Sequence, residues 1–203
     1  MKAVLTADII NSTKSSSTAW IDVLKKALKN FGTEGKDWEI YRGDEFQMLI
    51  EDSKTAFLTA ITIKAALKIT SFDAKIAIGL GDVDYLGKHI KESNGSAFIN
   101  SGRMLDELKN NRDQTLSIKS TQENLDENFN LIFLLLENTF EKWTESTATA
   151  LLTFLENQDL NQNQIEEKLG IYQIAFSQSL KRGNADAIIL TDQYFRKIIA
   201  GIL

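Results

Sequence analysis

The segment from Trp38 to Ile50, WEIYRGDEFQMLI, constrains the fold more than any other part of this sequence. Apolar residues alternate with polar ones on both flanks, and this period of two is typical of half-buried strands. Arg42-Gly43-Asp44 lies between the flanks and suits a tight turn. The segment therefore predicts a β-hairpin with the Asp44 carboxylate exposed at its tip as a candidate metal ligand. The alternative is that Gly43-Asp44 is ordinary turn chemistry.

Composition excludes several classes of site. The chain has 203 residues, 43% of them hydrophobic, which is enough for a substantial core. It has no cysteine and a single histidine, His89, so disulfides, thiolate metal sites and histidine-rich zinc sites are excluded. The net charge of −5 argues against nonspecific coating of nucleic acid. No apolar run approaches the length of a membrane span, so we expect a cytoplasmic protein with no membrane partner.

A second acidic strand end precedes the hairpin. Ala3 to Ile10 is a short apolar run whose charged residue, Asp8, lies near its end. We therefore expect a central strand that presents this carboxylate at the edge of the sheet. The polar loop from Asn11 to Thr18 follows and opens a helix. Its serines and threonines either cap that helix or leave backbone N–H groups free for a phosphate, and the local sequence favours neither.

The remaining N-terminal segments predict an α+β sheet domain. A helix that begins at Ser53 leads to a buried strand at Ala74 to Leu80. A helix at Gly95 to Leu108 and a strand at Thr115 to Lys119 follow. The order strand, helix, hairpin, helix, strand is typical of an α+β sheet that carries its helices on one face.

The C-terminal residues predict a separate helical unit. The expected helices are 147–157, 162–169 and 172–182. Gly170-Ile171 turns between the last two, which is the layout of a helix-turn-helix. Ala185 to Leu190 and a closing helix from Thr191 would complete a tri-helical or winged unit. The side chains that would face DNA are Gln173, Ser177, Gln178, Lys181 and Arg182. Acidic residues slightly outnumber basic ones in this region, so a packing or dimerisation unit is the alternative.

These motifs, in this order, resemble the class III nucleotidyl cyclases. The family's first-strand aspartate falls on Asp8 in ADIINST, and its hairpin aspartate falls on Asp44 in RGDEF. A later glycine and arginine fall on Gly95 and Arg103. The resemblance implies a ferredoxin-like or palm sheet, Mg²⁺ or Mn²⁺ on the two aspartates, and Arg103 as the catalytic residue that stabilises charge on the transferred phosphorus. The residues that would contact the bound nucleoside triphosphate are Ile9, Asn11, Ser12, Thr13 and Gly43.

The sequence departs from the class III pattern at positions that matter for turnover. The asparagine that orients the ribose falls at Ile99, and the neighbouring Asn100 is turned about 100° around the helix. The base-selecting lysine falls at Ile40 and its acidic partner at Glu92, so no purine preference is implied. RGDEF also resembles the signature of the diguanylate cyclases, but Arg42 replaces its first glycine, and that activity is less favoured.

The chain resembles the SatD family of small bacterial proteins through two parts together, a cyclase-like domain from ADIINST through GSAFINSGR and a C-terminal unit that contains NQIEEKLGIYQIAFSQSLKRG. The expected division is a cyclase-like domain at 1–121, a helical connector at 122–145 and a helix-turn-helix domain at 146–203. The leading hypothesis is a nucleotide-responsive regulator that binds a nucleoside triphosphate with magnesium through its first part and DNA or a partner through its last part. The second hypothesis is an active cyclase, which would need a homodimer because class III sites form between two protomers. The third is a ligand-free scaffold in which Asp8 and Asp44 are relics.

Overall fold

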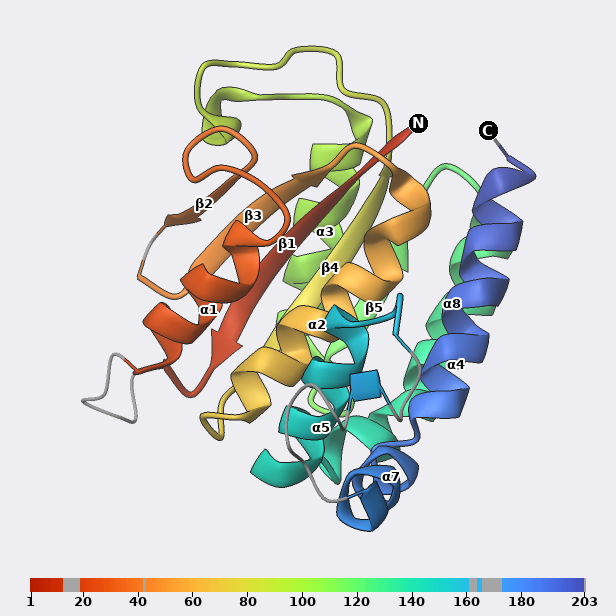
Figure 1. Cartoon of the computed structure of the whole chain (residues 1–203). Coiled ribbons are helices and arrows are strands. Elements are labelled where there is room, and N and C mark those ends of the chain that lie inside the picture. The colour runs from red at the N-terminus through yellow and green to blue at the C-terminus, as the bar shows by residue number, and fades with distance from the viewer. Residues whose placement is uncertain (13–18, 42, 161–163, 166–172, 203) are drawn as a thin grey trace.

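The computed structural model describes residues 1–12, 19–41, 43–160, 164–165 and 173–202. Its centre is a five-stranded mixed sheet with the spatial order β2-β3-β1-β4-β5 (Figure 1). The strands are β1 (Lys2–Ile10), β2 (Trp38–Tyr41), β3 (Glu45–Ile50), β4 (Asp73–Gly81) and β5 (Leu116–Lys119). β1 pairs antiparallel with both β3 and β4, and β5 adds parallel to β4. The predicted hairpin is confirmed as β2 and β3, with Trp38 opposite Met48.

Seven α-helices belong to the described part of the chain, together with two short 3-10 helices, η2 (Ser53–Thr55) and η3 (Ile90–Glu92). The α-helices are α1 (Ala19–Lys29), α2 (Ala56–Lys68), α3 (Ser96–Asn110), α4 (Glu123–Glu141), α5 (Glu145–Glu156), α7 (Gln173–Arg182) and α8 (Ala185–Ala200). The two segments expected from Ala185 and from Thr191 form a single helix, α8, because their buried residues recur on one helical face. None of the described helices is long and apolar enough to span a bilayer.

Helices cover both faces of the sheet, so the prediction that they lie on one face is wrong. Alternate residues of β1 point to opposite sides. Leu5 belongs to the core beneath α1 and α2, whereas Val4 packs under α3. In Figure 1 α1 and α2 lie in front of the sheet and α3 lies behind it. At Gly79 a Cβ atom would collide with the backbone of α3, so glycine permits the close approach of this helix to β4.

The helices after β5 join the main core. α4 packs along β5, and α5 packs against α2. Phe57 of α2 stacks on Phe133 of α4 with their ring centroids 5.4 Å apart, and Phe129 of α4 meets Phe195 of α8 at 4.9 Å. These residues belong to the same hydrophobic cluster as the core of the sheet. The segment expected to be a connector therefore has a packing role, and the division of the chain at 121 and 145 stays a prediction.

Much of the predicted helix-turn-helix, including Gly170 and Ile171, lies outside the described residues. Its last helix is present as α7, which buries Phe176 and Leu180 and packs against α5. The described residues after Lys119 contain no strand, so they show no wing. The DNA-binding arrangement as a whole stays a prediction.

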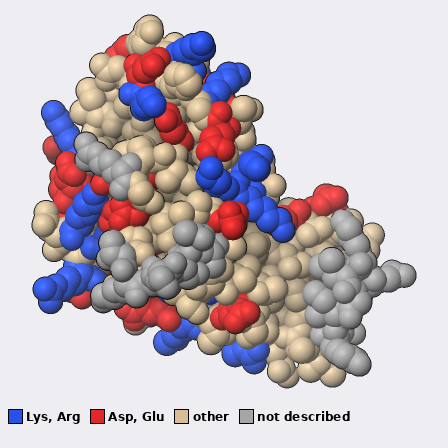
Figure 2. Space-filling view, turned by 90° about the vertical axis from the view of Figure 1, so that its left-hand side faces the viewer, with Lys and Arg blue, Asp and Glu red and all other residues tan. Residues whose placement is uncertain are grey.

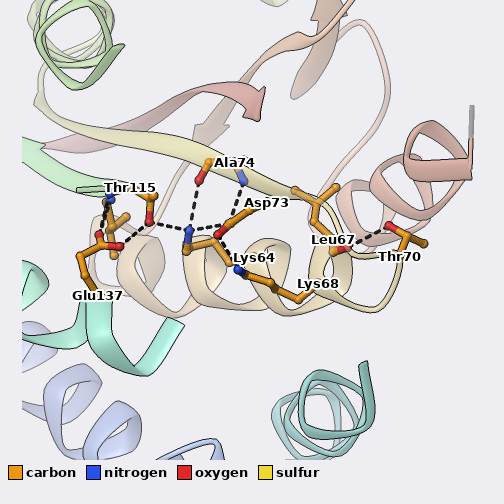
Figure 3. A network of polar contacts seen from close by, with 9 residues as sticks. Lys64, Leu67, Lys68, Thr70, Asp73, Ala74, Thr115 and Glu137 are labelled. Carbon is orange, nitrogen blue, oxygen red and sulfur yellow. Dashed lines mark hydrogen bonds and ion pairs between the residues drawn. The ribbon is translucent and has the colours of Figure 1, made fainter. Parts of the chain in front are cut away.

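A buried polar network joins α2, β4, β5 and α4 (Figure 3). Lys64 is fully buried, and its ammonium donates to Asp73 Oδ1 at 2.6 Å and to Thr115 Oγ1 at 2.8 Å. Lys68 pairs with the other carboxylate oxygen of Asp73 at 2.9 Å. Burial acts to raise the pKa of Asp73, but the two lysines outweigh it and lower that pKa. Glu137 of α4 accepts hydrogen bonds from the backbone N–H and the hydroxyl of Thr115, which ties α4 to the sheet.

Candidate functional site

Asp8 and Asp44 lie close together at one end of the sheet. The antiparallel register of β1 and β3 sets Asp8 opposite Glu45, the residue after Asp44. The backbone N–H of Ile9 donates to the carbonyl oxygen of Asp44 at 3.0 Å, and Ser12 Oγ donates to Asp44 Oδ2 at 2.6 Å. Strand pairing therefore unites two acidic segments that a helix and a strand separate along the chain.

The surroundings of Asp8 raise the pKa of its carboxyl group. Burial is the largest cause, and the negative charges of Asp44 and Glu45 act in the same direction, whereas Lys109 and Lys75 oppose them. The balance disfavours the charged form of Asp8 in the free protein. A divalent cation at this strand end would supply the missing positive charge, and this is the electrostatic argument for a ligand site.

Lys109, at the end of α3, provides part of that charge in the free protein. Its ammonium lies 2.6 Å from Glu45 Oε1 and 3.9 Å from Asp8 Oδ1. Burial acts to lower the pKa of Lys109, but the hydrogen bond to Glu45 and the nearby carboxylates outweigh it and raise that pKa. Lys75 holds this end of α3 because its Nζ donates to the carbonyl oxygen of Leu108 at 2.6 Å. The sequence analysis did not identify Glu45, Lys75 or Lys109 as part of this strand end. Only Glu45 could have been identified, because it follows Asp44 directly in the sequence.

The other predicted nucleotide contacts offer different groups to a ligand. The side chain of Ile9 is buried in the core, so this residue has only backbone atoms available. Asn11 is exposed and has a left-handed backbone with a φ of 61°. Gly43 is also exposed, and its φ of 88° favours glycine. Ser12 is occupied by its hydrogen bond to Asp44, and Thr13 lies outside the described residues.

The structure does not bring Arg103 to the two aspartates. Arg103 is exposed on α3, and within the described ranges it makes no ion pair with either carboxylate. Ile99 is 46% exposed on the same helix. Asn100 is buried, and its side-chain amide donates to the carbonyl oxygen of Leu80 at 2.8 Å. The amide of Asn100 is therefore committed to the sheet, and a catalytic role for Arg103 stays a prediction.

The donors at this strand end suit magnesium that is bound together with a phosphate. Over the described residues no three His, Cys, Asp or Glu side chains are grouped so that they could hold a metal ion. Mg²⁺ in proteins commonly keeps several waters and takes one or two carboxylates plus phosphate oxygens. Asp8 and Asp44 supply two carboxylates, and a Cβ atom added at Gly43 would meet nothing within 4 Å. Two carboxylates beside open space are therefore the groups that this strand end could offer to a metal ion bound with a phosphate.

The predicted DNA contacts on α7 are partly exposed. Gln178, Lys181 and Arg182 lie at the surface, and the guanidinium of Arg182 donates to Ser179 Oγ at 2.9 Å. Ser177 is half-buried, and the side chain of Gln173 is outside the described set. Figure 2, which views the molecule from the left of Figure 1, shows acidic and basic side chains interspersed over that face. The described side chains in this view therefore do not form the single basic region typical of nucleic-acid binding.

Comparison of the chain with protein-family models, with curated proteins and with solved structures found no match. The geometry of the strand end and the motifs that meet there are therefore the basis for a functional proposal.

Proposed function

We propose that this protein is a nucleotide-responsive regulator that binds a nucleoside triphosphate with magnesium at Asp8 and Asp44. The observation that supports this function best is that strand pairing brings Asp8 of β1 close enough to Asp44, the residue before β3, for the charge of Asp44 to act on the Asp8 carboxyl group. The first four strands have the order β4-β1-β3-β2 and are connected as β-α-β-β-α-β, which is the connectivity of a ferredoxin-like sheet. This connectivity supports the resemblance to the palm-like domain of the nucleotidyl cyclases.

Each residue of the strand end has a distinct role in this proposal. Asp8 and Asp44 hold the divalent ion, which neutralises triphosphate charge when it is bound. Ser12 fixes the carboxylate of Asp44 by its hydrogen bond at 2.6 Å. Lys109 offsets the charge of Glu45 and Asp8 in the free protein, and its ammonium would supply positive charge beside a bound triphosphate.

Binding is better supported than rapid turnover. The family's ribose-orienting asparagine is replaced by Ile99, whose side chain has no polar group, and the amide of Asn100 is occupied by the carbonyl of Leu80. The loss of one oriented polar contact to a transition state typically costs about 3 kcal/mol, or about two orders of magnitude in rate. The acidic pair that would hold metal and nucleotide is unaffected by this loss.

We place the target-binding region of the regulator in the C-terminal helices. α2 follows β3 in the chain and packs against α5, which in turn packs against α7. Because α2 also packs against β1 and β4, packed helices connect the sheet that carries Asp8 to the exposed residues Gln178 and Lys181 of α7. DNA or a partner protein is the proposed target of that surface.

A thermal-shift experiment tests the nucleotide site. ATP and GTP would each be added at saturating concentration, with Mg²⁺ or with a chelator. A ligand at 100 times its dissociation constant adds about 2.7 kcal/mol to the stability of a protein. For a chain of this size that corresponds to a rise in Tm of roughly 5–11 °C. Asp44→Asn should abolish the rise with Mg²⁺ and nucleotide. In chelator the same variant should raise Tm, because it removes a negative charge that disfavours charged Asp8.

Asp84→Asn is the matched control. Asp84 is an exposed aspartate that follows β4, at the end of the sheet opposite to Asp8, because Gly81 pairs with Lys2 in the register of β1 and β4. This variant should keep the full response to magnesium and nucleotide. If Asp44→Asn responds as strongly as Asp84→Asn, the aspartate pair is not the nucleotide site.

A further inference from the structure

A cavity of about 630 Å³ opens among α1, α2, α5 and α8. It lies on the α1 and α2 side of the sheet, whereas Asp8 shares its face of β1 with Val4 and Thr6, which point toward α3. Binding sites for small molecules in proteins typically enclose about 300–1,000 Å³. The cavity is therefore large enough for a small organic ligand and is separate from the proposed nucleotide site.

The charged groups around this cavity favour an anion. Lys26 of α1 and Arg196 of α8 both line it, against one acidic residue, Glu156 of α5. Lys26 makes no ion pair within the described part of the chain. Arg196 donates from Nε to Asp192 Oδ2 at 2.6 Å, which leaves the outer guanidinium nitrogens for a ligand. Glu156 already accepts a hydrogen bond from the side chain of Asn30, the residue after α1, at 3.1 Å.

The interior of the cavity offers a polar group that lacks a partner. Thr59 of α2 lines the cavity, is only 3% exposed, and its hydroxyl makes no hydrogen bond to any described residue. This hydroxyl is not among the fully buried side-chain atoms that lack a partner, so it borders the open cavity and can form a hydrogen bond to a ligand there. One turn further along α2, Thr62 donates its hydroxyl hydrogen to the carbonyl of Leu58 at 2.8 Å and can still accept a hydrogen bond. Hydroxyl groups with unused hydrogen-bonding capacity are typical of a site where a ligand provides the hydrogen-bond partner.

Three residues form the apolar part of the lining, and the space continues beyond this cavity. Leu58 and Leu155 line it, and Phe31, whose ring is 37% exposed, lies at the boundary with a second cavity. The second cavity has a volume of about 290 Å³, shares Phe31 and Thr59 with the first, and reaches β3. A flat apolar group can pack on the phenyl ring and the leucines while a negative charge meets the two cations.

We propose that this cavity is a second ligand site that binds a small organic anion carrying a flat apolar group. Lys26 and Arg196 bind the anionic group, Thr59 forms a hydrogen bond to the ligand, and Phe31 packs on its apolar part. The ligand contacts helices that cover the sheet and helices from the C-terminal region at the same time. Occupancy therefore stabilises the packing of α5 and α8 on α1 and α2.

Two fluorescent probes of matched shape test this site. The anionic probe is 8-anilinonaphthalene-1-sulfonate, and the neutral control is N-phenyl-1-naphthylamine, which has the same rings without the sulfonate. We expect one saturable equivalent of the anionic probe per chain, and binding of the neutral probe that is at least about tenfold weaker. Lys26→Glu should weaken binding of the anionic probe by about tenfold or more, which corresponds to about 1.4 kcal/mol. Lys29→Glu, a charge reversal on the same helix outside the cavity, should leave it unchanged.

Thr59→Val provides a second readout that does not depend on charge. It removes the hydroxyl at nearly constant volume and leaves the charges of the lining in place, so it should weaken binding of the anionic probe. Asp8→Asn should leave probe binding unchanged, which separates this site from the proposed nucleotide site. Equal effects of Lys26→Glu and Lys29→Glu, equal affinity for the two probes, or the absence of saturable binding would each overturn the proposal.

Discussion

Replacing Lys64 with methionine is the sharpest test of what holds the C-terminal helices to the sheet. The side chain of Lys64 is completely buried in α2, and its ammonium donates to Asp73, to Thr115 and to the carbonyl oxygen of Ala74 at 2.6, 2.8 and 3.1 Å (Figure 3). Methionine fills similar space but makes none of these contacts. Asp73 then keeps one cation, Lys68, at 2.9 Å.

The expected loss follows from breaking a buried ion pair. Removal of one partner typically costs about 3–5 kcal/mol, because the other charge stays buried without compensation. Lys68 still faces Asp73, so we expect the lower part of this range. For a chain of this length each kcal/mol shifts Tm by about 2–4 °C, which gives a fall of roughly 6–12 °C for a loss of about 3 kcal/mol.

Urea unfolding followed by circular dichroism measures this loss as a change in the free energy of unfolding. Lys68→Met is the matched control, since it removes the other lysine of the same aspartate from a position that is 17% exposed. It should cost about 1–2 kcal/mol, because Lys64 remains to neutralise Asp73. Equal losses in the two variants, or a loss below about 1 kcal/mol for Lys64→Met, would refute the argument that burial makes Lys64 the dominant partner.

Three further predictions concern acid, turnover and DNA. The two lysines lower the pKa of Asp73 in the folded protein, so its charged form stabilises the fold fully at pH values above the unfolded pKa of about 3.9. This stabilisation is lost as the pH falls through the folded-state pKa. Asp73→Asn should therefore lose less free energy of unfolding on acid titration than the unaltered protein does. Ile99→Asn should create or raise cyclic product from nucleoside triphosphate and Mn²⁺, measured by chromatography, and robust product from the unaltered protein would contradict the regulator proposal. Lys181→Ala with Arg182→Ala should reduce retention of genomic DNA at low salt, and unchanged retention would leave a partner protein as the target of α7.

The acidic pair was predictable from the sequence, but the rest of its site was not. Asp8 can be identified because it is the charged residue of an apolar run, and Asp44 because it precedes a segment in which apolar and polar residues alternate. Both patterns are local. Lys109 belongs to a helix that begins long after β3, and nothing in its neighbourhood marks it as the partner of Glu45. The packing of α3 against the sheet decides that contact. The same packing directs the amide of Asn100 to the carbonyl of Leu80.

Local patterns in the sequence predicted all five strands and most helix positions of the described chain. They could do so because the repeat of two residues in strands and of 3.6 residues in helices is a local property of the chain. The packing of the whole fold places α3 on the second face of the sheet, which the local patterns did not predict. It also buries Lys64 completely, although the sequence around Lys64 is that of an ordinary helix. It also decided that α8 is a single helix. The physical reason is that burial depends on which faces meet across the whole fold, and those pairings join residues that are far apart in the chain.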